Sequence, residues 1–124
     1  MFHKFWHALV VAMTSWHQGK LFIEHSLSFS HDSIHILAGV LIWLAAGLLV
    51  RRPLSSWSPW LCVLALILWN ETVDLTLEVW PDAGWQYGES FKDLLLTMSV
   101  PTLLMVATRL RPDLFRGGVG RRRR

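Results

Sequence analysis

Three long apolar stretches, at residues 33–50, 59–80 and 91–110, dominate this sequence of 124 residues. Each is close to the roughly 20 residues that an α-helix needs to cross the hydrocarbon core of a bilayer. The connections between them are rich in Arg, Pro and Gly, which are typical of helix ends. We therefore predict an all-α membrane protein whose three transmembrane helices form one domain over residues 31–110.

An amphipathic helix is expected before the first span, within residues 1–30. Over residues 2–17 the apolar side chains recur at helical spacing, and His, Lys and Thr occupy the other face. The apolar face is too short to span, so we expect an interfacial helix whose aromatic rings enter the acyl boundary. Gly19 is expected to end this helix, and residues 21–29 have no clear pattern.

Several residues indicate where the spans begin and end. Asp32 or Ser33 is expected to cap the first span, and Ser58 the second. Pro81 is expected to end the second span, because the residue before a proline disfavours the helical conformation. Pro101 is expected to kink the third span, because proline lacks the N–H that would bond the carbonyl four residues earlier.

Arginine residues indicate the orientation in the membrane. They follow the first and third spans, and the positive-inside rule places both regions in the cytoplasm. We therefore expect a bacterial inner (cytoplasmic) membrane protein with its N-terminus outside and a basic cytoplasmic tail at residues 111–124. The arginines expected to contact anionic lipid are Arg51, Arg52, Arg109, Arg111, Arg121, Arg122, Arg123 and Arg124. The run of four arginines at residues 121–124 lacks interleaved aromatic residues, so nucleic acid is not an expected partner.

Polar side chains within the spans gather in their outer halves. Glu71 lies roughly 13 Å from the end of its span, near the middle of a hydrocarbon core about 30 Å thick. An ionised carboxylate there costs at least ~3 kcal/mol, so it must pair, become protonated or face a polar cleft. We expect an outward-open cleft with Asn70, Glu71 and Asp74 as its floor. The candidate ligand-binding residues are His35, Asn70, Glu71, Asp74, Glu78, Asp93 and Thr97.

Two kinds of role remain open for these residues. Asp93 follows Ser90 by three positions, which fits a capping box as well as a site. A structural pairing with His35, without any bound ligand, would also account for the carboxylates of Glu71 and Asp74. His31, His35, Glu71 and Asp74 form a candidate set for a divalent metal, because imidazole and carboxylate are common metal ligands. The cofactor is not fixed by the sequence, and no nucleophile–base pair or nucleotide motif indicates an enzyme.

Two sequence stretches carry a family resemblance. Residues 69–75 (WNETVDL), followed by residues 90–97 (SFKDLLLT), resemble small proteobacterial membrane proteins of uncharacterised function and, loosely, VanZ-type membrane proteins. VanZ-type proteins place an intramembrane Glu in one helix and an Asp at the start of the next, which the resemblance carries to Glu71 and Asp93. It covers residues 57–108 and departs from the family in lacking the Gln after the Glu and the Arg-containing loop before the Asp. The family is linked to glycopeptide resistance and envelope lipids, so the resemblance implies an interaction with lipid.

Three functions are consistent with these patterns. The first is binding of a polar ligand, either a lipid headgroup or a metal ion, in the outer cleft. The second is an accessory or structural subunit of a larger membrane complex, with His35 contacting a pigment or haem as a special case. The third is a membrane-embedded lipid-modifying enzyme with Glu71 as its base. Membrane lipids and other membrane-protein subunits are the expected partners.

Overall fold

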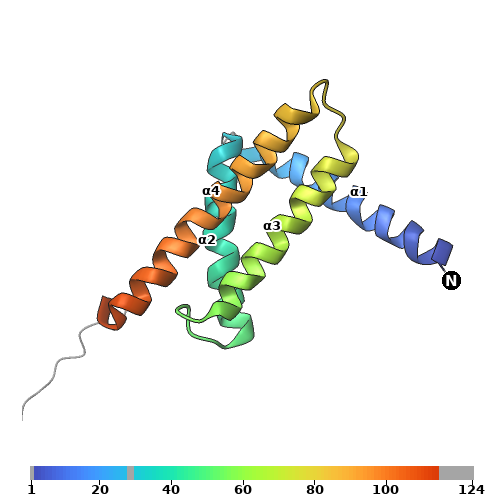
Figure 1. Cartoon of the computed structure of the whole chain (residues 1–124). Helices are drawn as coiled ribbons and strands as arrows, with labels where there is room; N and C mark the ends of the chain where they lie inside the picture. Colours follow the sequence, from blue (N-terminus) through green and yellow to red (C-terminus); the bar gives the residue numbers. More distant parts are fainter. Residues whose placement is uncertain (1, 28–29, 115–124) are drawn as a thin grey trace, which may run out of the picture.

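In the described part of the chain, three long helices form a bundle, and a further long helix crosses it at one end (Figure 1). The computed structural model describes residues 2–27 and 30–114, and these contain no strand. The helices are α1 (Phe2–Leu27), α2 (His31–Val50), α3 (Trp57–Leu77) and α4 (Ala83–Leu110), followed by the short 3-10 helix η1 (Pro112–Leu114). Helices α2, α3 and α4 pack against one another, and α1 packs against α3. The predicted all-α fold is confirmed.

The three bundle helices have the character of membrane spans. Each of α2, α3 and α4 is long and apolar enough to cross a bilayer, and only 28–33% of each span is buried inside the bundle. The remaining surface is largely apolar: Leu41, Leu48, Leu61 and Leu103 are among many exposed leucines. An apolar exterior of this extent suits lipid as the surrounding solvent. The chain is therefore a multi-pass membrane protein.

A small apolar core holds the bundle together. Trp43 of α2, Val63 and Ile67 of α3, and Met98 and Met105 of α4 are buried against one another. Helices α2 and α4 also approach closely at Gly39, where an added Cβ would lie 2.0 Å from the carbonyl oxygen of Thr97. The absence of a side chain at Gly39 permits this close helix contact.

Helix α1 is longer than the sequence pattern indicated. The prediction that Gly19 ends it is wrong, because the helix continues to Leu27. A glycine inside a helix costs only about 1 kcal/mol relative to alanine. The continued turn brings Lys20 to Asp74 and Glu24 to His31, and these contacts favour the extension.

The starts of the three bundle helices also differ from those predicted. Ser30, rather than Asp32 or Ser33, caps α2, and its side chain accepts a hydrogen bond from the Ser33 N–H. Ser56, rather than Ser58, precedes α3, which begins at Trp57 instead of residue 59. The side chain of Asp82 caps α4 by accepting from two backbone N–H groups, so α4 begins at Ala83 and not at residue 91.

These boundaries change two further interpretations. Helix α3 ends at Leu77, short of the predicted stop at Pro81, and Glu78 adopts an extended conformation. Ser90 lies inside α4, so of the two roles left open for Asp93 the capping box with Ser90 is excluded. The carboxylate of Asp93 therefore has no capping role. Helix α4 continues through Pro101.

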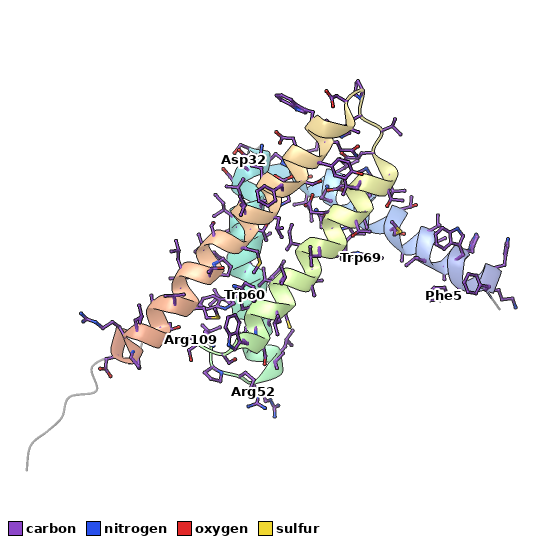
Figure 2. The ribbon with its side chains drawn as sticks, in the orientation of Figure 1. Phe5, Asp32, Arg52, Trp60, Trp69 and Arg109 are labelled. Carbon is purple, nitrogen blue, oxygen red and sulfur yellow. The ribbon has the colours of Figure 1, made fainter. Side chains whose placement is uncertain are left out.

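The arginines of the described residues mark one end of the bundle. Arg52 and Arg109 lie at the end opposite Asp32 (Figure 2). Arg109 donates from Nε to the carbonyl oxygen of Ser55 at 2.7 Å and lies over the Trp57 ring, 4.6 Å from its centroid. Arg111 follows α4 directly. The predicted lipid contacts of residues 121–124 lie outside the described residues.

Candidate functional site

The buried polar side chains gather near the bundle end opposite the arginines. Among the described residues, six polar side chains are buried, and all six belong to the predicted cleft: His35, Asn70, Glu71, Asp74, Asp93 and Thr97. The seventh predicted residue, Glu78, is partly exposed and accepts a hydrogen bond from the Trp80 indole at 3.0 Å. The prediction that these side chains face the bundle agrees with their burial.

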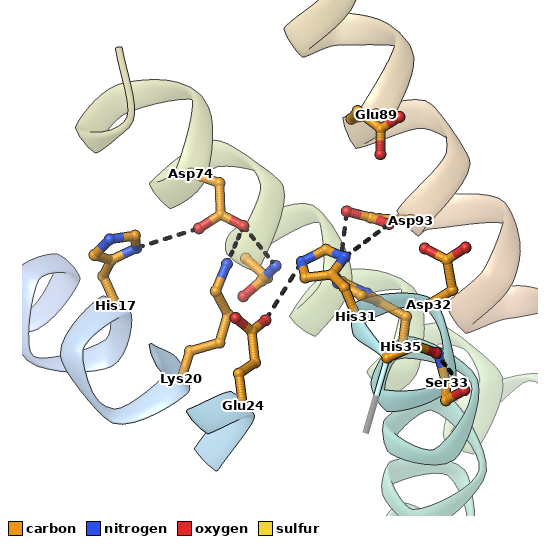
Figure 3. Close-up of polar contacts among 12 residues, drawn as sticks. His17, Lys20, Glu24, His31, Asp32, Ser33, His35, Asp74, Glu89 and Asp93 are labelled. Carbon is orange, nitrogen blue, oxygen red and sulfur yellow. Dashed lines mark hydrogen bonds and ion pairs between the residues drawn. The ribbon is translucent and has the colours of Figure 1, made fainter. Parts of the chain in front are cut away.

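Two histidines of α2 and one aspartate of α4 form the first cluster (Figure 3). His31 and His35 lie one helical turn apart, with ring centroids separated by 4.7 Å. His31 Nδ1 is 3.7 Å from Asp93 Oδ1, and His35 Nε2 is 3.5 Å from Asp93 Oδ2. Both distances are longer than a hydrogen bond, which spans about 2.7–3.2 Å between nitrogen and oxygen. Asp93 Oδ1 is buried without a hydrogen-bond partner.

The second nitrogen of each histidine contacts a different oxygen. His35 Nδ1 is hydrogen-bonded to Thr97 Oγ1 at 3.0 Å, and His31 Nε2 lies 3.3 Å from Glu24 Oε1. The His35 imidazole is therefore held by Thr97, and both imidazoles present one nitrogen to Asp93. This arrangement orients both rings toward one point.

Helix α1 supplies partners for the acidic half of α3. Lys20 pairs with Asp74 Oδ2, and His17 Nδ1 lies 3.5 Å from Asp74 Oδ1 (Figure 3). The indole of Trp16 donates to Asn70 Oδ1 at 3.0 Å. The amide of Asn70 in turn donates to Glu71 and Asp74, each at 3.1 Å. Asp74 is thus paired by α1 rather than by the histidines of α2, whereas Glu71 accepts a hydrogen bond from Asn70 of its own helix.

A polar cavity of about 240 Å³ lies between these groups. Six carboxylates and two lysines line it, together with His31 and a few neutral polar residues. The carboxylates are Asp32, Glu71, Asp74, Glu78, Glu89 and Asp93, and the lysines are Lys20 and Lys92. Lys92 bridges Asp32 at 3.1 Å and Glu89 at 2.5 Å. With ionised side chains the cavity wall is strongly acidic.

The predicted single cleft is divided in the structure. Glu71, Asp74, Glu78 and Asp93 line the acidic cavity, whereas His35, Asn70 and Thr97 line a separate, largely apolar one. The predicted metal set is divided too. Within the described residues, His31 and His35 group with Asp93, and Asp74 groups with His17 and Glu78, while Glu71 joins neither group. Glu71 instead accepts a hydrogen bond from Asn70 and lines the acidic cavity.

Sequence reasoning missed the contribution of α1. His17, Lys20 and Glu24 are spaced at three and four residues and share one helix face, but the predicted stop at Gly19 separated them. Extending the helical pattern through that glycine would have revealed the polar stripe. Comparisons with family models, with curated proteins and with solved structures found no match to this chain.

Proposed function

We propose that this membrane protein binds a divalent transition-metal ion through His31, His35 and Asp93, beside the acidic cavity. The observation that carries the proposal is the convergence of three potential ligand atoms within 4.8 Å of one another. Imidazole nitrogen and carboxylate oxygen are suited to Zn²⁺, Fe²⁺ and related ions. Three protein ligands with a remaining open position are typical of accessible metal centres.

The spacing of the cluster supports a metal more than a hydrogen bond. Two ligand atoms of a tetrahedral Zn²⁺ site, each about 2.0–2.1 Å from the metal, are about 3.4 Å apart. The two His–Asp93 distances, 3.5 and 3.7 Å, are close to this value. A small inward movement of the exposed His31 side chain would complete the geometry.

The contacts behind the histidines support the same ligand. Histidines that bind metals generally donate their other ring N–H to an oxygen, which fixes the tautomer and the ring orientation. Thr97 is that oxygen for His35, and for His31 the nearest candidate is Glu24 Oε1, which lies 3.3 Å from Nε2 without a formed hydrogen bond. When Nδ1–H of His35 donates to Thr97, its Nε2 presents a lone pair to the Asp93 carboxylate. A cation between them satisfies both atoms.

The charge of the cavity favours a cation over an anion. Six carboxylates outnumber two lysines along its wall, and Lys92 is already paired with two of them. A low-dielectric surrounding strengthens the attraction for a cation. The same charge opposes a lipid phosphate, so the metal ion is favoured over a phosphate-bearing headgroup.

Metal binding is tested with the full chain in detergent, with Co²⁺ as the probe and its absorption bands and metal content as readouts. Loss of a ligand's hydrogen-bond partner weakens metal binding by about 10–100-fold. Asp93→Asn and His31→Ala change a ligand itself, so we expect each to weaken Co²⁺ binding by more than this. His25→Ala is the matched control, because His25 is exposed and belongs to neither cluster. Equal Co²⁺ affinity in wild type and Asp93→Asn would refute the proposal.

The orientation and the place of α1 are part of the same proposal. The arginine-rich end supports a cytoplasmic location for that end, which puts the acidic cavity on the outer side. Phe2, Phe5 and Trp6 are 86%, 66% and 62% exposed, and α1 projects beyond the bundle (Figure 2). Exposed aromatic residues on a helix too polar to span support a position in the membrane interface.

A further inference from the structure

A second cavity, of about 420 Å³, lies beneath α1 and between α2 and α3. Its wall is mostly apolar and includes Trp16, Ile23, Ile34, Ile42, Leu66 and Ile67. Pockets of this size with apolar walls and a few polar groups are typical ligand sites. The metal proposal makes no use of this cavity.

The cavity has one polar edge and one apolar end. Lys20 and Glu24 of α1 lie along its edge, and Lys20 also lines the acidic cavity. Ile42 lies eleven residues after the start of α2, which is about 16 Å along the helix and near the middle of a core about 30 Å thick. The cavity therefore extends from the polar end of the bundle to the depth of the lipid acyl chains.

The side of the cavity is open to the surrounding membrane. Ile23 is 50% exposed and Leu66 is 39% exposed, so the wall on the α1 and α3 side is incomplete. Water is a poor occupant, because an apolar cavity offers it too few polar partners. At this depth of the membrane the opening faces acyl chains, which are apolar like the wall of the cavity.

Gly19 leaves room for this occupant. It lines the cavity, and a Cβ placed on it would meet no atom within 4 Å. Its presence inside α1, where alanine would favour the helix, has no packing explanation within the helix itself. The open space in front of Gly19 enlarges the cavity at its edge.

We infer that this cavity holds one acyl chain of a membrane phospholipid, with the headgroup at the edge formed by Lys20 and Glu24. Lys20 is paired with Asp74 and Glu24 lies 3.3 Å from His31, so the charges at that edge are balanced and suit a headgroup without net charge. The site is distinct from the metal cluster, although His35 lies in the wall between them. Bound lipid would fill the gap between α1 and α2.

Native mass spectrometry in dodecylmaltoside, with added palmitoyl-oleoyl phosphatidylethanolamine, tests this inference. We expect one retained lipid per wild-type chain and an at least fivefold lower occupancy for Gly19→Leu, whose side chain fills the cavity. Gly88→Leu is the matched control, because Gly88 has equal space, lies outside both cavities and should leave occupancy unchanged.

Two results would overturn the inference: no retained lipid on the wild-type chain, or equal occupancy in Gly19→Leu and wild type. A Co²⁺ titration of the same Gly19→Leu sample separates the two sites. We expect its Co²⁺ affinity to equal that of wild type, because Gly19 supplies no ligand atom to the His31–His35–Asp93 cluster and a Cβ at this position meets no atom within 4 Å. Loss of lipid with unchanged Co²⁺ affinity supports the lipid site, whatever the outcome of the metal test.

Discussion

The backbone of Gly39 lies directly against the carbonyl oxygen of Thr97, and a Cβ at Gly39 would sit 2.0 Å from that oxygen. Pro101 follows Thr97 by four residues and has no N–H, so this carbonyl lacks its usual helical partner. The close approach of α2 therefore occurs at the one turn of α4 where the proline leaves a carbonyl free. The side chain of Thr97 also bonds His35, so the same residue of α4 makes both the close backbone contact and the contact with the histidine cluster.

Gly39→Ala is expected to destabilise the bundle by about 2 kcal/mol, in the range of other overpacked cores. The neighbouring atom belongs to the backbone of α4, so α2 and α4 must move apart. Unfolding by SDS titration measures the change. Gly88→Ala, at an open position of α4, should instead be neutral or slightly stabilising. Equal stability of the two variants would contradict the close contact.

Lys20→Met is expected to cost about 3 kcal/mol, because it leaves Asp74 buried without its charge partner. The double variant Lys20→Met/Asp74→Asn should recover most of this loss, since the remaining amide carries no charge. A double-mutant cycle on unfolding free energies measures the coupling. Additive effects of the two single substitutions would show that the pair contributes little.

Thr97→Val is expected to weaken Co²⁺ binding by about 10–100-fold without removing a ligand, because His35 loses the oxygen that orients its ring. The side chains have similar shapes, so the packing against α2 is largely kept. Thr76→Val is the control, since Thr76 bonds only the backbone of its own helix. An unchanged Co²⁺ affinity in Thr97→Val would remove Thr97 from the site.

The orientation is tested by cysteine labelling in a Cys62→Ala background. Gly88→Cys near the start of α4 should react with an impermeant maleimide on intact cells, because the acidic end is expected outside. Ser55→Cys, beside Arg109, should react only after the membrane is opened. The reverse labelling pattern would invert the proposed orientation.

Sequence reasoning located the buried polar residues because an intramembrane charge has few tolerable environments. Asn70, Glu71 and Asp74 were assigned to the interior on that argument, and all three are buried. The pattern does not specify which partner each side chain meets. The position of Asp74 in the sequence is equally consistent with an ion pair to a histidine of α2 or to a lysine of α1. The packing of α1 on α3 is what selects Lys20 as its partner.

Helix boundaries were harder to predict than helix existence. Asp82 and Ser90 both offer capping oxygens, and the intervening Gly84 and Gly88 resemble a loop. The side chain of Asp82 accepts two backbone N–H groups, which starts α4 eight residues before the predicted position. This early start places Glu89 and Ser90 on the helix, where they join the wall of the acidic cavity.

The pairing of Lys20 with Asp74 also bears on biogenesis, because the cation precedes its anion by 54 residues. At translation rates of about 5–20 residues per second, Lys20 leaves the ribosome roughly 3–11 seconds before Asp74. Lys20 is therefore synthesised, and can reach the bilayer, before the span that carries Asp74 leaves the ribosome. Delivery of the protein's N-terminal segment to the membrane would then govern how efficiently the translocon accepts that span.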